Sequence, residues 1–504
     1  MMDTISEFLL DYRYLPVVIL LVLYLLIKFH KSNDHDIPTV RLSRFLPDFV
    51  NRQIFFLKAP AQIQYGYDTY KDRPFWVLRP DSDLLVLPRR YLEEIRQISS
   101  VKMSPLEAQY NNILGQYTNI LPNSELTGHT VARKLTPALN RILPRLLHEL
   151  HHAFEDEIPS YKDWTPINLY TTILRLVSRT TSSIIVSNVT SCNEKWLETI
   201  TTYSTNVGLT ILCLRPVPRP LRPLVARFLP CVRNMHQSLR WVQDELIGPT
   251  ILARREAEAR NAQYRKPDDL LQWMMDSADN EYDRDPRNLA QALLIITALG
   301  AVHTSTSLIT QVMYDLLARP EYIDVLREEV QDTLAERWIN GTQASFAAQV
   351  KLDSVLRESL RCNPTSEVST QRVAKVPFTF SDGFTVPKGA QICFPAGPMS
   401  RDNDLTPDAL AYDAFRWCKN PKSTGTSLVS VGYTNIHFGY GRLACPGRFY
   451  AANTTKAILS RLLVEYDIEY QPGRRERPKH LRIGEQIMPS MSITVLIRER
   501  GVRV

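Results

Sequence analysis

The sequence predicts a mainly α-helical protein with a few short β segments, preceded by one N-terminal transmembrane helix. From roughly residue 90 to residue 365 the pattern is mainly helical. Residues 75–78 and 84–87 have the pattern of two strands separated by a turn, and residues 377–395 alternate around Asp382 and Gly383 as a β-hairpin does. Residues 14–27 carry no charge. The helical part is the longest, so the expected fold class is mainly α.

Residues 1–31 are expected to form a membrane anchor. Extended back to Phe8, the run is about 20 residues long, which is enough to cross the core of a bilayer, although Asp11 and Arg13 interrupt it. Basic residues follow this run and acidic residues precede it, so the N-terminus should lie in the lumen and the main body in the cytosol. A cleaved signal peptide is the alternative, but its flanking charges would be reversed and no A-x-A-like site follows.

The rest of the chain is expected to be one large domain behind a short hinge. Residues 32–60 contain three prolines among polar residues, which is typical of a hinge. Residues 61–504 contain no Gly/Ser-rich linker, low-complexity tract or internal repeat. We therefore expect 61–504 to fold as a single domain.

Charge and cysteine content exclude some classes of protein. The formal net charge of +7 is modest for 504 residues and forms no long basic arm, which argues against nucleic acid as a partner. An anionic membrane or an acidic protein remains compatible with this charge. The seven cysteines show no CxxC pairs, which argues against a disulfide framework and for a reducing compartment.

One helix should be unusually long. Asp285 can cap its first turn, Pro286 suits that turn, and nothing interrupts it before Pro320. That is roughly 33 residues, or about 50 Å at 1.5 Å per residue. Its middle is apolar nearly all round, which predicts burial.

A stripe of small residues lies in the middle of this helix. Thr297, Ala301 and Thr304 recur at helical spacing, with Gly300 beside them. Such a stripe would let a flat ligand lie close to the backbone. It would equally allow another helix to pack tightly.

Residues 215–223 read RPVPRPLRP and are expected not to be helical. Their prolines lack backbone donors and bias the preceding residues to extended conformations. The segment is either a loop that dips into a membrane over a substrate entrance or a rigid connector between helices.

Residues 437–450 (HFGYGRLACPGRFY) crowd three glycines around one cysteine, Cys445. Glycine lets a backbone turn sharply close to a cofactor. Pro446 is a favoured first helical residue, so the sulfur of Cys445 should lie at a helix N-terminus, where the helix dipole favours thiolate. Pro446 has no N–H, which leaves the amides of Gly447 and Arg448 as donors to the sulfur. A free cysteine in an ordinary turn is the alternative.

This stretch resembles the haem-binding loop of the cytochrome P-450 family, F-x-x-G-x-R/H-x-C-x-G. The positions that match are Phe438, Gly441, Cys445 and Gly447. Leu443 stands where the family usually has Arg or His, and Arg442 is one residue early. The resemblance implies that the Cys445 thiolate is the axial ligand of the iron of haem b.

A second motif agrees with this resemblance. Glu358 and Arg361 form an E-x-x-R pair, and the i, i+3 spacing puts both charges on one helix face. Alone, such a pair is common on protein surfaces. Ahead of the cysteine it resembles the family's K-helix pair, and Arg416 in Phe-Arg-Trp resembles its third member. The resemblance implies a buried network of Glu358, Arg361 and Arg416 that supports the haem pocket.

The small-residue stripe resembles the family's distal helix motif A/G-G-x-D/E-T-T/S. The resemblance implies that Thr304 is the hydroxyl that relays protons during oxygen activation. His303 occupies a position where the family usually has an acidic residue. His303 either relays protons itself or is a packed helix residue that points away from the pocket.

Four basic residues are candidates to bind the haem propionates, because buried carboxylates need partners. His129 and Arg133 resemble the family's W/H-x-x-x-R helix. Arg372 lies where the family often has a propionate-binding arginine. Arg442 would replace the charge missing at Leu443, unless its offset points it elsewhere.

The resemblance covers roughly residues 38–500. It implies a helical prism with a smaller β-rich lobe, and a monooxygenase that uses dioxygen and electrons from NADPH. The chain has no flavin domain or Rossmann fingerprint, so the electrons should come from a separate NADPH–cytochrome P-450 reductase. The expected substrate is an apolar small molecule, a terpenoid or meroterpenoid of fungal secondary metabolism. The expected location is the endoplasmic reticulum membrane, with a single span.

Two other functions use the same loop. A haem-thiolate isomerase, dehydratase or peroxygenase would work without a reductase, and the replacement of the usual acid by His303 keeps this alternative open. A non-catalytic haem carrier or sensor is the second, but it would have no need of the Thr304 hydroxyl.

Overall fold

The computed structural model describes residues 37–43, 45–120, 124–158, 160–186, 190–334, 338–419 and 425–501. The expected membrane anchor, residues 1–31, lies outside the described residues, as do residues 32–36 of the expected hinge. Within the described residues the chain is mainly helical with four small sheets, which confirms the expected fold class for this part of the chain.

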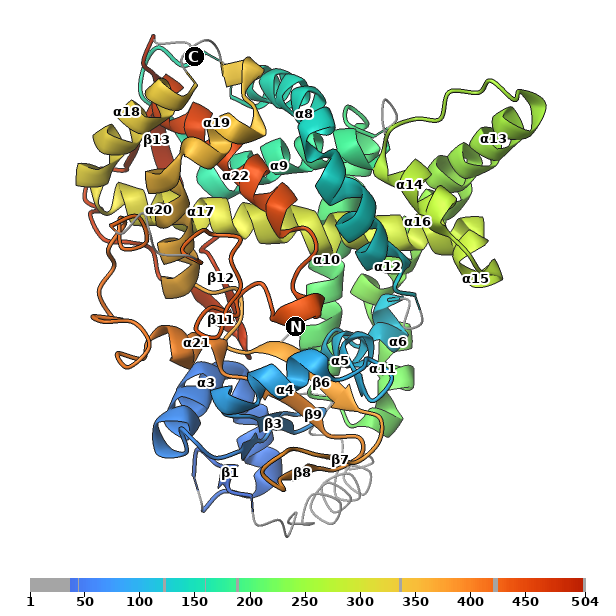
Figure 1. Cartoon of the computed structure of the whole chain (residues 1–504), viewed down its shortest axis with the longest axis vertical. Helices are drawn as coiled ribbons and strands as arrows, with labels where there is room; N and C mark the ends of the chain where they lie inside the picture. The colour runs from blue at the N-terminus through green and yellow to red at the C-terminus, as the bar shows by residue number, and fades with distance from the viewer. Residues whose placement is uncertain are drawn as a thin grey trace, which may run out of the picture.

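The largest sheet has six strands in the order β1-β2-β3-β9-β6-β4. The strands are Thr39–Val40 (β1), Phe75–Val77 (β2), Leu84–Val86 (β3), Gln391–Phe394 (β9), Ser369–Ala374 (β6) and Met103–Ser104 (β4). β2 and β3 pair antiparallel with Trp76 opposite Leu85, so the two strands expected at 75–78 and 84–87 are confirmed. β3 then pairs with β9 in parallel, which joins distant parts of the chain at the lower end of Figure 1.

The expected hairpin at 377–395 is present but short. β7 (Phe378–Thr379) pairs antiparallel with β8 (Thr385–Val386). Gly383 between them has a φ of 88°, a left-handed conformation that favours glycine. The following residues leave the hairpin and enter the large sheet as β9.

Two smaller sheets lie elsewhere. One has the order β10-β13-β5, formed by Tyr466–Tyr470, Thr494–Glu499 and Thr165–Asn168. The other pairs β11 (Leu481–Ile483) with β12 (Gln486–Met488), and the turn between these strands carries Glu485.

Most of the described part of the expected hinge is a helix. α3 spans Asp48–Thr69 and contains Pro60 in its interior. Phe55, Ala59 and Ile63 on one face of α3 are fully buried, and this packing offsets the disruption that an interior proline causes. The range 48–60 is therefore part of the folded body, and the expectation of a hinge there is wrong.

The expected long helix runs from Pro286 to Leu317, 32 residues, in three parts. They are α16 (Pro286–Ile295), a π-helical segment (Ile296–Val302) and α17 (His303–Leu317). The Asp285 side chain accepts hydrogen bonds from the amides of Arg287 and Asn288, as a cap does. Among the described residues this is the one helix long and apolar enough to span a membrane, but 56% of its most apolar window is buried inside the protein, as in a core helix.

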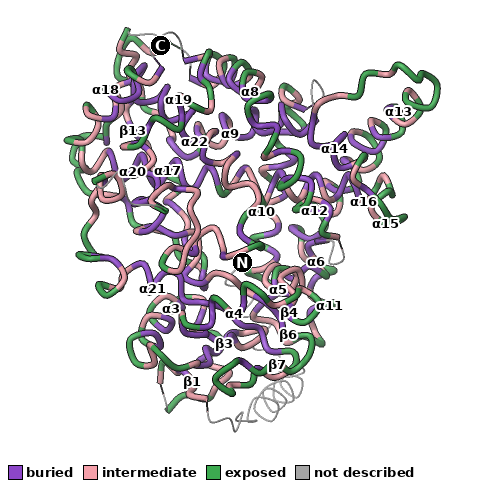
Figure 2. Tube along the Cα trace, in the orientation of Figure 1, coloured by how far each residue is buried: buried purple, intermediate pink, exposed green. Residues whose placement is uncertain are grey.

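Other helices surround this central helix. The longer ones are α8 (Thr136–Glu157), α9 (Leu169–Ile185), α10 (Glu194–Leu214), α12 (Pro230–Trp241), α13 (Ile247–Arg260), α18 (Ile323–Thr333), α20 (Val350–Cys362) and α22 (Arg448–Glu465). The shorter ones are α4 (Leu92–Gln97), α5 (Pro105–Asn112), α6 (Gly115–Thr118), α7 (Leu126–Thr130), α11 (Arg222–Phe228), α14 (Leu270–Ser277), α15 (Glu281–Arg284), α19 (Gln343–Ala348) and α21 (Ala396–Ser400). α17 contacts α9, α20 and α22, and Figure 2 shows much of this region in purple, the colour of buried residues.

The expectation that residues 215–223 contain no helix is partly wrong. A 3-10 turn covers Arg219–Leu221, and α11 begins at Arg222 with Pro223 in its first turn. A proline there loses no hydrogen bond, because the first amides of a helix have no partner within it. The Arg222 guanidinium donates to the carbonyl of Arg215 at 3.0 Å, which favours a rigid connector between α10 and α11.

Candidate functional site

The cysteine loop, residues 437–447, contains a 3-10 turn at Gly441–Leu443 and leads into α22. The Cys445 amide donates to the Phe438 carbonyl at 2.6 Å and closes the loop. Gly439 and Gly441 have φ values of 80° and 66°, which residues with a Cβ rarely adopt. α22 begins at Arg448 with Gly447 at its cap, so the expectation that Pro446 is the first helical residue is wrong by two positions.

The Cys445 sulfur faces two opposing electrostatic effects. Burial raises the pKa of the Cys445 thiol, whereas the amides of Gly447 and Arg448 lower it, and burial is the larger effect. The two amides are therefore the predicted donors, but the protein groups alone do not favour thiolate. A metal cation bound to the sulfur would reverse this balance, because a coordinating thiol loses its proton.

Cys445 is accessible to solvent although burial dominates its pKa. In the middle of the central helix Gly300 and Thr304 are also exposed, whereas their neighbours in sequence are half-buried or, at Ser305, buried. Cys445, Gly300 and Thr304 therefore each have surface that the protein does not cover.

The structure divides the small-residue stripe. Thr297 is fully buried and donates to the Leu293 carbonyl at 2.7 Å, so it serves packing. Thr304 donates to the Gly300 carbonyl at 2.8 Å and remains exposed. Tight packing therefore applies at Thr297, whereas Gly300 and Thr304 are left exposed.

His303 contacts two neighbouring helices. Its Nδ1 lies 3.2 Å from the Tyr170 hydroxyl on α9, and its Nε2 is hydrogen-bonded to Ser204 on α10. Burial lowers the pKa of His303 to about 4, so the ring is neutral near pH 7. In this conformation both ring nitrogens have partners on the side of α9 and α10.

The structure brings Glu358, Arg361 and Arg416 together, and we call this set the Glu358 network. Arg361 donates to both carboxylate oxygens of Glu358, at 2.9 and 2.7 Å, and Arg416 donates to one of them at 3.1 Å. The Trp417 indole donates to the other oxygen at 3.0 Å. Burial alone raises the pKa of Glu358, but the Arg361 bond and the other donors outweigh it and hold the pKa below its usual value. Glu358 therefore remains ionised inside the protein.

Arg372 is buried and has no counter-ion among the described residues. Only 2% of it is exposed, and its Nη1 has no hydrogen-bond partner among the described residues. Burial lowers the pKa of Arg372 to about 10. A buried guanidinium of this kind fits an anionic ligand that is not part of the chain.

The other three candidate basic residues are exposed. His129 on α7 lies 3.3 Å from Glu125, and Arg133 lies in a π-helical segment, Val131–Leu135. Arg442 lines a surface pocket with Arg96, Gln97 and Gly441. No contact joins any of the three to Arg372 among the described residues.

Several contacts of the cysteine loop were missed by the sequence analysis. His437 lies 2.8 Å from the Ser400 hydroxyl, Arg448 donates to the Cys445 carbonyl at 2.8 Å, and Tyr440 donates to Glu93. Arg448 lies within the motif and could have been found. Glu93 precedes Tyr440 by 347 positions, and no sequence signal marks it.

Comparison with known proteins agrees with this geometry. The family model for Cytochrome P450 matches residues 123–496. Cytochrome P450 monooxygenase paxP of Penicillium paxilli is 43% identical over 492 residues, covering 97% of this chain and 95% of the relative. Cytochrome P450 monooxygenase penP of Penicillium crustosum is 44% identical over 489 residues, covering 96% and 94%. Cytochrome P450 monooxygenase AtmP of Aspergillus flavus is 40% identical over 487 residues, covering 96% and 93%. The chain therefore belongs to the cytochrome P450 family of haem-thiolate monooxygenases.

Proposed function

We propose that this enzyme hydroxylates or otherwise oxidises an apolar small molecule, using dioxygen and electrons that a separate reductase takes from NADPH. The observation that carries the proposal is the accessible Cys445 sulfur, which is held in a glycine-rich loop by two amides. When bound, haem b supplies the iron at which dioxygen is activated.

The residues present fit haem in charge as well as in ligand type. Cys445 would hold the iron, and Phe438, Gly441 and Gly447 form the loop around it. Arg372, with its unpartnered Nη1, would bind a propionate. His129, Arg133 and Arg442 are the further propionate candidates, and His129 would have to leave Glu125 to reach one.

The Glu358 network would support this site without touching the substrate. Arg361 donates to the carbonyls of Ser400 and Ala409, both at 2.6 Å. The Ser400 hydroxyl in turn contacts His437, which begins the cysteine loop. The network therefore connects α20 to the loop through two short contacts.

Thr304 would relay protons during oxygen activation. Its hydroxyl donates to the Gly300 carbonyl, so its oxygen is available to accept a proton from another donor. A hydroxyl that both donates and accepts can pass a proton on. We assign it that role.

His303 would pass protons between its ring nitrogens rather than store one. Its pKa of about 4 keeps it neutral near pH 7, and both nitrogens are bonded to hydroxyl groups. Replacement of His303 by Asp would restore the residue type usual in the family. If His303 is a relay, this variant should keep coupled turnover, whereas His303→Leu should lose it.

The membrane location follows from the apolar N-terminal run and from exposed apolar residues on the body. Residues 8–27 would form the single span in the endoplasmic reticulum membrane, with the enzyme facing the cytosol. Leu224 and Phe228 of α11 are 61% and 74% exposed, as expected for a surface close to lipid. Loss of membrane binding on removal of residues 1–31 would support this location, and full retention would contradict it.

The substrate class rests on the apolar central helix and on the fungal monooxygenases that resemble this chain. Leu299 and Ala301 flank the exposed Gly300 and are half-buried, so the surface around Gly300 is apolar. We infer a terpenoid or meroterpenoid intermediate of fungal secondary-metabolite biosynthesis.

The first experiment is a reduced carbon monoxide difference spectrum of the wild type and of Cys445→Ala. The wild type should show a thiolate-ligated Soret band, and the variant should lose it. Cys393→Ala is a matched control, because Cys393 is buried in β9 and distant from the loop in sequence. An identical thiolate band in Cys445→Ala would contradict the proposed ligand.

A second experiment separates the monooxygenase from the isomerase, dehydratase or peroxygenase that uses no reductase. Product formation should require NADPH, reductase and dioxygen together. Product formed anaerobically from substrate alone would establish the alternative.

Thr304→Ala should bind substrate normally but divert reducing equivalents to peroxide, and undiminished coupling would remove the relay role.

A further inference from the structure

Helix α4 lies against the cysteine loop at Tyr440. The Tyr440 hydroxyl donates a hydrogen bond to Oε1 of Glu93, and only 7% of Tyr440 is exposed. A hydrogen bond to a carboxylate is stronger than one between neutral groups. Tyr440 is therefore fixed to a helix that lies 347 positions earlier in the chain.

The next residue of the loop is covered by the same helix. A Cβ placed on Gly441 would lie 2.3 Å from Cγ of Arg96, and Gly441 has a φ of 66°. The Arg96 guanidinium Nε lies 3.5 Å from Glu93 Oε2, and both side chains are about half exposed. Glu93 and Arg96 thus contact two consecutive residues of the loop.

The path from this contact to the sulfur is short. Gly441–Leu443 form a 3-10 turn, and the Ala444 amide donates to the Gly441 carbonyl at 3.2 Å. Cys445 follows directly, and its own amide is bonded to Phe438. A turn closed at both ends moves as a unit, so a displacement of Tyr440 and Gly441 displaces Cys445.

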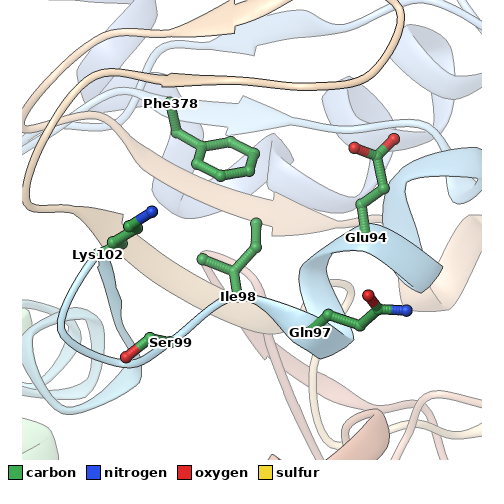
Figure 3. Close-up of a pocket in the computed structure, with 6 residues that line it drawn as sticks. All are labelled: Glu94, Gln97, Ile98, Ser99, Lys102 and Phe378. Carbon is green, nitrogen blue, oxygen red and sulfur yellow. The ribbon is translucent and has the colours of Figure 1, made fainter.

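The neighbouring glutamate of α4, Glu94, contacts a different part of the protein. Glu94 accepts hydrogen bonds from the amide and hydroxyl of Ser381, at 3.0 and 2.7 Å. Figure 3 shows Glu94 and Gln97 on α4 around a pocket that Phe378 of β7 closes on the far side. Adjacent glutamates of one helix therefore contact different parts of the protein, and only Glu93 reaches the loop.

We propose that Glu93 and Arg96 are positioning residues that hold Tyr440 and Gly441 and thereby fix the Cys445 sulfur relative to the haem. This inference rests on the proposed role of Cys445 as the haem ligand. It adds a support from α4 to the support that the Glu358 network gives from α20. Loss of the α4 support should loosen the thiolate ligand while leaving the fold intact.

Tyr440→Phe removes only the hydroxyl that reaches Glu93, and Tyr91→Phe is its matched control. The Tyr91 hydroxyl donates to Asp382 at 2.6 Å, near the same helix but towards the β7–β8 hairpin. Burial and a carboxylate partner raise the pKa of each tyrosine to about 12, and the Tyr91 hydroxyl also accepts a hydrogen bond from Arg90 at 2.9 Å. The control therefore measures what the loss of such a bond does away from the loop.

The readouts are the rate of haem transfer to apomyoglobin, the reduced carbon monoxide spectrum and the unfolding temperature. Tyr440→Phe should raise the rate of haem loss about tenfold, as expected for one lost hydrogen bond to a charged group, and should convert part of the thiolate band to an inactive form. Tyr91→Phe should lower the unfolding temperature similarly but leave haem loss within about twofold of the wild type.

Glu93→Gln keeps an acceptor for the Tyr440 hydroxyl, so its increase in the rate of haem loss should be less than half of that seen with Glu93→Ala. Equal rates of haem loss in Tyr440→Phe and Tyr91→Phe would overturn the inference. A wild-type protein without a thiolate band would instead overturn the proposed ligand, so the two failures are distinguishable.

Discussion

Two networks of buried charge connect distant parts of this enzyme, and they differ in how their members are spaced along the chain. In the Glu358 network, Glu358 and Arg361 are one helical turn apart, and Arg416 follows 58 positions after Glu358. In the second network, Arg79 lies 3.1 Å from Glu485, which is 406 positions away. Both pairs are almost completely buried.

We call the second set, Arg79, Asp81, Arg215 and Glu485, the Arg79 network. Arg79 lies 2.9 Å from Asp81, and Arg215 at the end of α10 lies 3.2 Å from the same aspartate. Glu485 is in the turn between β11 and β12. The network therefore ties the large sheet, the connector after α10 and the β11–β12 turn together.

The comparison shows two ways to keep charge inside a protein. One acid, Glu358, serves two arginines through fixed bidentate geometry, so the loss of that acid leaves two cations unpaired. The Arg79 network has two acids for two arginines, so the loss of one member leaves partial compensation. The two designs should respond differently to single substitutions.

The largest effect is expected for Glu358→Ala. This variant leaves the buried Arg361 and the half-buried Arg416 without the Glu358 counter-ion, which should lower the free energy of unfolding by about 3–5 kcal/mol. Chemical unfolding followed by tryptophan fluorescence, together with haem content after purification, would measure it. A loss below about 1 kcal/mol would show that the network is not a major support of the fold.

A smaller effect is expected for Arg79→Met, which keeps much of the side-chain volume. Arg215 still lies near Asp81 and Glu485, so the free energy of unfolding should fall by about 2–3 kcal/mol. The same unfolding experiment on Arg79→Met, Arg215→Met and the double variant tests the sharing of charge. If the double variant loses no more than the sum of the single variants, the arginines do not compensate for each other.

His303, unlike the charged members of the two networks, is neutral near pH 7. Burial lowers the pKa of His303 to about 4 from its ordinary 6.5, so the unfolded chain binds more protons than the folded chain between these values. Stability should therefore fall by about 1 kcal/mol per pH unit as the pH drops below 6.5, and the loss should end near pH 4. His303→Gln should reduce this slope, and His148→Gln on the exposed face of α8 should not. Equal slopes in both variants would contradict the assignment.

The smallest effect is expected for Arg141→Ala. Arg141 makes two hydrogen bonds with Asp268, at 2.6 and 2.8 Å, but its side chain is 64% exposed. Solvent screening should limit the loss to about 0.5 kcal/mol despite this geometry. A loss comparable to that of Arg79→Met would show that geometry, rather than burial, determines the value of these pairs.

The same contrast explains what could be predicted from the sequence. Glu358 and Arg361 could be predicted because helical spacing alone puts them on one face, and the Asp285 cap followed from its place before Pro286. Arg79 and Glu485 could not be predicted, because only the paired strands and the β11–β12 turn bring them together. Tyr440 and Glu93 were missed for the same reason.

Two local predictions failed where tertiary packing decided the outcome. Pro60 indicated a hinge, but buried neighbours on α3 keep that segment helical. Pro446 indicated the first turn of a helix, but the turn at the cysteine continues through Gly447. Proline restricts the backbone without specifying which of its permitted structures forms, so the surrounding contacts decide.

The number of residues in the π-helical segment Ile296–Val302 determines how Thr304 is oriented relative to the first part of the central helix. A π turn holds one residue more than an α turn, and deletion of one residue there would rotate the residues on one side by about 100° relative to the other. Thr304 lies two residues after this segment. Such a deletion would therefore change the direction of the Thr304 side chain without replacing it. Chimeric enzymes that exchange this helix should therefore be joined outside 296–302. Alignments of this segment should be judged by residue count before residue type.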